Sequence, residues 1–167
     1  MGANGEIKEI IYRYELTVAD KIKIQEVICS SSCFSEAEVK VAIELAEEHL
    51  TKKEESGYSF ILAESFGKVL GYVCFGPIAG TDKRFDIYWI AVLNNLRHLG
   101  IGKKLLIEAE KKIIAMDGKL IYIETSSREP YQAARKFYQK NGYKEEAIIS
   151  DFYSEGDHKI IYSKKIK

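Results

Sequence analysis

The chain has 167 residues, of which 46% are hydrophobic and 30% are charged, proportions of a folded globular protein with a sizeable core and not of a disordered or fibrous one. Its 25 lysine and arginine residues equal its 25 aspartate and glutamate residues, so no overall positive field favours nucleic acid or an anionic membrane surface. We therefore expect a single domain over residues 6–167, preceded by a flexible tail at 1–5, with no nucleic-acid partner and no membrane association.

The three cysteines, Cys29, Cys33 and Cys74, make an odd set, and neither a signal peptide nor a long apolar span accompanies them. This pattern favours reduced thiols in a cytoplasmic protein. Cys29 and Cys33 are four residues apart on a predicted helix, but the histidines are scattered without ligand spacing, so we expect no metal site.

The first half of the chain predicts a strand, two helices and a hairpin. Alternating apolar residues over 8–15 indicate the strand, and residues 17–30 are typical of a helix. Ser35 and Glu38 form a capping box that opens the second helix, whose apolar stripe ends near Leu50. Residues 58–66 and 69–75 flank Gly67 and predict an antiparallel hairpin.

The second half alternates strands with helices. Strands are predicted over 85–92 and 120–125, and helices over 101–116 and 130–140. Two last strands, over 143–149 and 159–164, are joined by the acidic, aromatic segment 151–157. We expect that segment to be a loop that either binds an ammonium group, by charge and cation–π contact, or is a solvated turn. The order predicts an α/β (α+β) fold with a mixed, mostly antiparallel sheet of about seven strands and about four flanking helices.

A glycine-containing run, Arg97-His98-Leu99-Gly100-Ile101-Gly102, lies between the strand over 85–92 and the helix that follows. The first turn of a helix leaves backbone N–H groups without partners and is partly positive, so anions bind there. Glycine lets phosphate oxygens approach the main chain closely, and Arg97 and Lys103 add positive charge at the rim. The run therefore predicts a diphosphate site.

Spacing separates the known kinds of glycine loop. A Walker loop is excluded because no glycine stands five residues before Gly102 and Lys104 occupies the place of its Ser or Thr. A dinucleotide fingerprint is disfavoured because Leu105 stands where its third small residue belongs. A plain turn before a surface helix is the remaining alternative.

The run Ile90-Ala91-Val92 followed by Arg-x-x-Gly-x-Gly resembles the acyl-CoA loop of the GCN5-related N-acetyltransferase (GNAT) family. A second resemblance lies at Phe137-Tyr138, which Gly142 and Tyr143 follow at the spacing typical of that family. The likeness is strongest over 85–143 and implies the GNAT acyl-CoA N-acyltransferase fold. It also implies acetyl-CoA as the cofactor.

In that family the fourth and fifth strands part, and the exposed main chain of the fourth pairs with pantetheine. The resemblance implies this role for Ile90 and Val92, with the N–H of Val92 directed at the thioester oxygen. Tyr131 stands where the family commonly has an asparagine that touches coenzyme A, so Ser127, with Ser126 and Arg128 beside it, is expected to substitute. The remaining predicted cofactor contacts are Arg97, His98, Gly100, Ile101, Gly102, Lys103 and Arg135.

The resemblance also implies catalytic roles. Tyr138 matches the tyrosine that protonates the leaving thiolate, and its ordinary pKa of about 10 makes that transfer not steeply uphill. Asp86, six residues before Val92, is the first choice for the base, and Glu124 is the rival. Either carboxylate could instead be structural or a clamp for a cationic substrate.

Strand alternation makes a further prediction about this site. It puts Asp86 on the same face as Tyr88, Ile90 and Val92, with Trp89 turned to the core on the other face.

These residues predict an acetyl-CoA-dependent N-acetyltransferase that acts on the primary amine of a small molecule, amino acid derivative or peptide by direct attack on the thioester. The acceptor and the oligomeric state stay open, with a homodimer as one possibility. A non-catalytic acyl-CoA-binding sensor or interaction module is the alternative. An aminoacyl-tRNA acetylating toxin is less favoured, because the net charge is zero.

Overall fold

The computed structural model describes residues 9–166, and the predicted tail over 1–5 lies outside them. Within this range a seven-stranded sheet has the order β1-β2-β3-β4-β5-β7-β6. Every neighbouring pair is antiparallel except β4 and β5, which are parallel. This confirms the predicted mixed, mostly antiparallel sheet. The strands are β1 (Ile11–Arg13), β2 (Ser59–Ser65), β3 (Lys68–Pro77), β4 (Arg84–Val92), β5 (Leu120–Ser126), β6 (Lys144–Ser154) and β7 (Asp157–Lys165).

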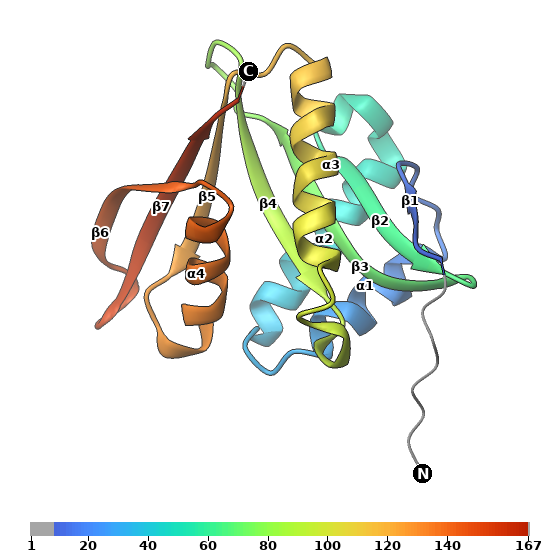
Figure 1. Cartoon of the computed structure of the whole chain (residues 1–167), viewed down its shortest axis with the longest axis horizontal. Coiled ribbons are helices and arrows are strands. Elements are labelled where there is room, and N and C mark those ends of the chain that lie inside the picture. Colours follow the sequence, from blue (N-terminus) through green and yellow to red (C-terminus); the bar gives the residue numbers. More distant parts are fainter. Residues whose placement is uncertain (1–8, 167) are drawn as a thin grey trace.

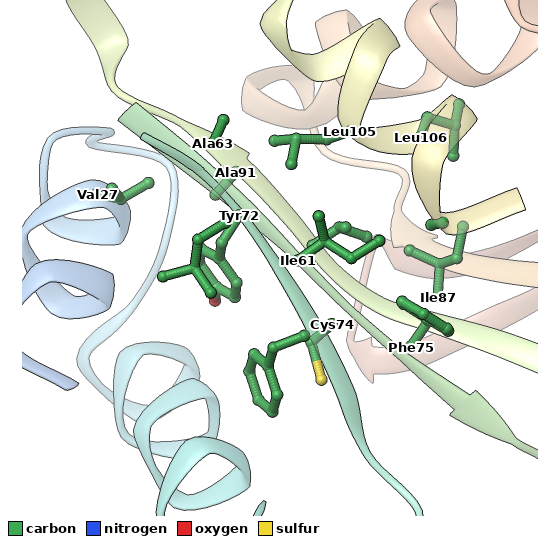
Figure 2. Close-up of a cluster of buried hydrophobic side chains, with 14 of the residues drawn as sticks. Val27, Ile61, Ala63, Tyr72, Cys74, Phe75, Ile87, Ala91, Leu105 and Leu106 are labelled. Carbon is green, nitrogen blue, oxygen red and sulfur yellow. The ribbon is translucent and has the colours of Figure 1, made fainter. Parts of the chain in front are cut away.

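Helices cover both faces of the sheet, with α3 and α4 on one face and α1 and α2 on the other (Figure 1). Figure 2 shows this layering in the core, where Val27 of α1 and Leu105 and Leu106 of α3 lie on opposite sides of the strands. No helix among residues 9–166 has the length and apolar character needed to cross a membrane. The helices are α1 (Asp20–Cys29), α2 (Glu36–Lys52), α3 (Ile101–Ala115) and α4 (Gln132–Lys140), with 3-10 turns η1 (Lys53–Ser56), η2 (Asn94–Leu96) and η3 (Glu129–Tyr131).

The predicted capping box of α2 is confirmed. The backbone N–H of Glu38 donates to the hydroxyl of Ser35 at 3.2 Å, and the backbone N–H of Ser35 donates to the Glu38 carboxylate at 2.8 Å. The helix begins where the sequence indicates because both orphan donors are satisfied by side chains at that spacing.

A β-bulge interrupts β4. Cys74 of β3 pairs with Trp89, but the next residue of β3, Phe75, pairs with Ile87, so Tyr88 is the extra residue on β4. Because side chains alternate between the two faces of a strand, one additional residue reverses the facing of everything beyond it.

The bulge overturns one prediction. Asp86 pairs with Gly76 and therefore shares the face of Cys74 and Trp89, which α1 and α2 cover. Ile90 and Val92 lie on the opposite face, towards α3. The prediction that Asp86 shares a face with Ile90 and Val92 is thus wrong, because simple alternation does not anticipate a bulge. Trp89 does pack against the core, as predicted.

The predicted loop over 151–157 is also wrong for most of its length. β6 continues to Ser154 and β7 starts at Asp157, which leaves a two-residue turn in which Gly156 has a φ of 76°. A turn whose second central residue alone has positive φ favours glycine there, because glycine adopts this conformation without strain. The polar composition of this segment hides the strands, which here lie at the exposed edge of the sheet.

A buried ion pair joins β1 to the start of α1. The carboxylate of Asp20, which is fully buried, accepts hydrogen bonds from the Arg13 guanidinium at 2.8 and 2.9 Å and from the backbone and hydroxyl of Thr17. Burial alone would raise the pKa of Asp20, but the hydrogen bonds from Arg13 and Thr17 outweigh it and hold the pKa well below its usual range.

We expect Arg13→Ala to lower the free energy of unfolding by about 3 kcal/mol at pH 7, because the buried Asp20 carboxylate loses both guanidinium hydrogen bonds and keeps only the more distant Lys23, at 3.6 Å, as a cationic partner. The exposed pair Lys21 with Glu47 gives a control, since Lys21→Ala removes less than about 1 kcal/mol. A carboxyl group whose folded-state pKa is depressed stabilises the fold above its unfolded pKa of about 4, and this stabilisation is lost as the pH falls. The difference in free energy of unfolding between the wild type and Arg13→Ala should therefore be smaller at acidic pH. Urea unfolding at pH 7 and pH 3.5 measures this. Equal deficits for the two variants would contradict it.

Candidate active site

The parallel strands β4 and β5 separate soon after they meet. They pair over three positions, from Arg84 with Leu120 to Asp86 with Tyr122, and then diverge (Figure 1). The remainder of β4, residues 87–92, has β3 on one side and an open edge on the other. Unpaired main-chain donors and acceptors at such an edge can bind an extended ligand as an added strand would.

Two of the predicted residues present their main chain to this edge. The N–H of Leu93 donates to the carbonyl of Leu70 at 2.8 Å, so it points towards β3. Because successive N–H groups of a strand point to opposite sides, the N–H groups of Val92 and Ile90 point away from β3 and into the gap. The geometry thus fits the predicted pairing of Ile90 and Val92 with amides of a ligand.

The glycine loop ends directly at the start of α3. Gly100 is the N-cap and has a φ of 79°, and the N–H of Lys104 is the first to bond back within the helix, to the carbonyl of Gly100. Ile101, Gly102 and Lys103 form the first turn, whose N–H groups have no acceptor among residues 9–166. Free donors at the positive end of a helix fit a diphosphate, which is the site that the sequence predicts here.

Gly102 brings three elements of the site together. A Cβ built on Gly102 would lie 3.6 Å from a methyl group of Val92 and 3.7 Å from the ring of Phe137. The first turn of α3 is thus flanked by the end of β4 and by α4. The residue that follows Phe137 is Tyr138, so the predicted acid belongs to the same neighbourhood.

Gly100 supports a prediction about this loop. A side chain in the left-handed region costs about 1–2 kcal/mol, so Gly100→Ala should either destabilise the fold or shift the first turn of α3, and we expect the Kd for coenzyme A to rise about tenfold. Gly80 has a similar φ of 74° with open space around it, in the turn after β3. Gly80→Ala should lower the Tm similarly and leave the Kd unchanged. Calorimetric titration that finds equal Kd values for both variants would disprove the role of the loop.

The loop between β4 and α3 is anchored to the turn after α1. Arg97 donates to the hydroxyl of Ser31 at 2.7 Å, and the N–H of Asn94 donates to the hydroxyl of Ser30 at 3.0 Å. Arg97 therefore fixes the loop to the turn after α1. The positive charge that it would add at the rim of a diphosphate site stays a prediction. His98, with a φ of 73°, turns the chain between Arg97 and Gly100.

Tyr138 lies on the α3 and α4 face of the sheet. Its side chain is 7% exposed and packs against the rings of Tyr143 and Tyr162, at centroid distances of 6.3 and 5.9 Å. Within residues 9–166, the fully buried side-chain polar atoms without a partner are the hydroxyls of Ser65 and Tyr72, so the Tyr138 hydroxyl, which also has no partner there, retains contact with solvent. Burial raises the pKa of Tyr138 above its ordinary value, and the hydroxyl therefore keeps its proton.

The two predicted bases lie on the opposite face, beside a third charged residue. Asp86 pairs with Tyr122, and Glu124 is two residues further along β5, so both carboxylates share the α1 and α2 face. Burial and the charge of Glu124 raise the pKa of Asp86 to about 6, although the charge of Lys159 opposes the shift. Glu124 is ion-paired with Lys159 at 2.6 Å. Asp86 is thus poised to accept a proton near neutral pH.

Tyr138 and Asp86 thus lie on opposite faces of the sheet, Asp86 at the last paired position before β4 and β5 diverge and Tyr138 against Tyr162 of β7, which is the next strand after β5. This arrangement suits a reaction in which one group gives a proton on one side and another takes a proton on the other.

Two further predicted cofactor residues have their own partners in the chain. The hydroxyl of Ser127 accepts from the N–H of His158 at 2.9 Å. Arg135 donates to the carbonyls of Ser126 and Arg128 at 2.7 and 2.9 Å. Both side chains therefore shape the end of β5 and its connection to α4, and their contact with a cofactor stays a prediction.

The structure adds residues that the sequence did not indicate. Phe34, from the turn between α1 and α2, packs on Trp89 at 5.3 Å and on Tyr131 at 6.1 Å. The hydroxyl of Tyr131 lies 2.6 Å from the carboxylate of Glu38. These residues form a wall beside the Asp86 face. Lys159 is the other addition. The sequence gives no local signal for the Phe34 contacts or for Lys159, because each of these contacts joins segments far apart in the chain.

Comparison with known families gives a match over residues 56–145 to the acetyltransferase (GNAT) domain. An uncharacterised N-acetyltransferase of Methanocaldococcus jannaschii is 31% identical over 106 residues, which are 64% of this chain and 65% of that protein. An N-alpha-acetyltransferase of Sulfurisphaera tokodaii is 30% identical over 122 residues, 66% of this chain and 69% of that protein. The chain thus matches about two thirds of the length of these relatives.

Solved structures agree with the fold over almost the whole chain. A protein assigned to the GNAT family from Desulfovibrio desulfuricans superposes with a TM-score of 0.93 at 34% identity, over 95% of this chain and 100% of that one. The PaiA N-acetyltransferase from Thermoplasma acidophilum, solved in complex with coenzyme A, gives a TM-score of 0.75 at 22% identity, over 95% and 99% of the two chains.

Proposed function

The chain belongs to the acetyltransferase (GNAT) domain family, and from this premise we propose that it transfers the acetyl group of acetyl-CoA to a primary amine by direct attack on the thioester. One arrangement supports the proposal: Tyr138, whose hydroxyl keeps its proton, and Asp86, whose pKa is raised to about 6, lie on opposite faces of the sheet near the point where β4 and β5 diverge. A module that only binds acyl-CoA has no need of such a pair.

The residues around the gap fit coenzyme A. The free N–H groups in the first turn of α3 would hold the diphosphate, with Lys103 and Arg97 at the rim. The main chain of Ile90 and Val92 would hold the pantetheine amides. Bound acetyl-CoA would supply an activated acyl group and a thiolate leaving group. The N–H of Val92 would then stabilise negative charge on the thioester oxygen, as an oxyanion-hole donor does.

Asp86 acts as the general base in this proposal. An acceptor amine enters protonated at neutral pH and must lose a proton before it attacks, and Asp86 takes that proton directly or through water. Glu124 is disfavoured because its carboxylate is already ion-paired with the Lys159 ammonium. Tyr138 donates its hydroxyl proton to the departing sulfur, after which the solvent reprotonates it.

Release of free thiol from acetyl-CoA, measured with a panel of primary amines, amino acid amides and short peptides, tests the proposal. We expect release well above the acceptor-free background with members of one acceptor class. Calorimetric binding of coenzyme A without any acceptor-dependent thiol release would establish a sensor instead. Failure to bind coenzyme A at all would remove both functions.

A further inference from the structure

Lys159 of β7 fills an arrangement suited to bind an ammonium group. Its Nζ lies 2.6 Å from the Glu124 carboxylate, 3.7 Å from the centre of the Phe152 ring and 5.9 Å from that of Tyr153. The Lys159 side chain is only 13% exposed. One carboxylate with aromatic faces around it is a combination by which proteins recognise cationic amines.

This cluster adjoins the proposed base. Glu124 and Asp86 share one face of the sheet, and the pKa of Asp86 responds both to Glu124, which raises it, and to Lys159, which lowers it. The Phe152 and Tyr153 rings come from the end of β6, in the segment for which the sequence left open either an ammonium-binding loop or a solvated turn. In this structure the ammonium group over the Phe152 ring is that of Lys159, a residue of the chain itself.

We propose that Glu124, Phe152 and Tyr153 form an ammonium subsite that Lys159 occupies from within, so that the protein selects acceptors with one charged amine and discriminates against diamines and polyamines. This inference rests on the proposed acetyl transfer. With Glu124 neutralised, Asp86 is left as the carboxylate for the reacting amine. A second ammonium on the acceptor meets the like charge of Lys159, which disfavours its binding.

The experiment compares acceptors that differ by one charge: butylamine with butane-1,4-diamine, and norleucine amide with lysine amide. The pair that the wild type acetylates faster is used. We expect Lys159→Ala to raise kcat/KM for the doubly charged member relative to the singly charged one about tenfold, the gain from one added ammonium–carboxylate contact. Lys159→Met, which keeps the subsite filled without charge, should give a smaller rise.

A control and a second measurement separate this effect from general damage. Lys165, exposed at the end of the same strand, is the matched control, and Lys165→Ala should leave the ratio unchanged. The second measurement needs no activity. Ethylammonium chloride should raise the Tm of Lys159→Ala by refilling the subsite, relative to sodium chloride at equal concentration, and should not do so for the wild type.

An unchanged selectivity ratio in Lys159→Ala, or an equal response of the variant and the wild type to ethylammonium, would overturn the inference and reduce the cluster to a structural ion pair. These outcomes differ from failure of the proposed function, which appears as a wild type that acetylates no acceptor. In that case the ethylammonium measurement alone decides whether the subsite exists.

Discussion

Replacing Tyr138 with phenylalanine is expected to lower kcat about 100-fold while the Kd for coenzyme A changes less than about twofold. The variant removes one hydroxyl from a ring that keeps its packing against Tyr143 and Tyr162. Without that proton donor the sulfur must leave as an unprotonated thiolate. Burial raises the pKa of Tyr138, and desolvation of the leaving sulfur would raise the pKa of the thiol in the same direction, so the transfer need not become steeply uphill.

Tyr143→Phe is the matched control for this prediction. The hydroxyl of Tyr143 donates to Glu110 at 3.1 Å and lies in the same aromatic cluster. Its loss should lower the Tm and leave kcat within about threefold, because it donates no proton to the reaction. Steady-state thiol release under saturating acetyl-CoA measures both variants. Equal kcat values for wild type and Tyr138→Phe would remove Tyr138 from the mechanism.

Replacing Asp86 with asparagine should lower kcat/KM for the acceptor about 100-fold and abolish its dependence on acidic pH. The pKa of Asp86 is raised to about 6, chiefly by burial and then by the charge of Glu124. A base works only when it is ionised, so the rate of the wild type should rise as pH increases through about 6. Lys159 and Tyr88 are the other titrating groups near this carboxylate.

Stability should change in the opposite direction. A carboxyl group with a folded-state pKa above its unfolded value favours the folded state at low pH, and this contribution is lost as pH rises through about 6. Asp86→Asn should therefore have a higher Tm than the wild type at pH 8 and a similar one at pH 4.

Glu124→Gln tests the assignment of the base. This variant should keep most of the activity. The pH at which kcat/KM falls to half on the acidic side of its profile (the acid limb) should be lower than in the wild type, because the Glu124 charge that helps to raise the pKa of Asp86 is gone. An acid limb that survives in Asp86→Asn and disappears in Glu124→Gln would reverse the roles of the two carboxylates.

The features that the sequence predicted correctly are those with local causes. The capping box of α2, the glycine loop directly before α3 and the hairpin of β2 and β3 around Gly67 each depend on neighbouring residues, and the structure contains all of them. The fold class followed from the order of these elements, and the spacing of Gly100, Gly102 and Tyr138 pointed to the site.

The rest depends on pairing between distant segments. At the bulge, two neighbouring residues of β3, Cys74 and Phe75, pair with Trp89 and Ile87 of β4 and leave Tyr88 unpaired. The sequence of β4 alone contains no signal for this change of face. The anchoring of Arg97 on Ser31 spans 66 residues. Lys159 and Glu124 meet because β7 lies beside β5 although β6 precedes it in the chain. Each contact becomes visible only when the strand order is known.

The short pairing between β4 and β5 divides the sheet into two parts, one with β1 to β4 and the other with β5, β7 and β6. Three paired positions connect these two parts through the backbone. Helix α3 adds a side-chain connection through Glu110, whose carboxylate accepts from Lys164 of β7 at 2.9 Å and from Tyr143, which follows α4, at 3.1 Å. Side-chain contacts of Glu110, away from the gap, therefore connect the two parts of the sheet in addition to the backbone pairing. Loss of the Glu110 carboxylate would remove the Lys164 ion pair and the Tyr143 hydrogen bond together, whereas Tyr143→Phe leaves the ion pair in place, so Glu110 is the residue at which the two parts of the sheet would be uncoupled.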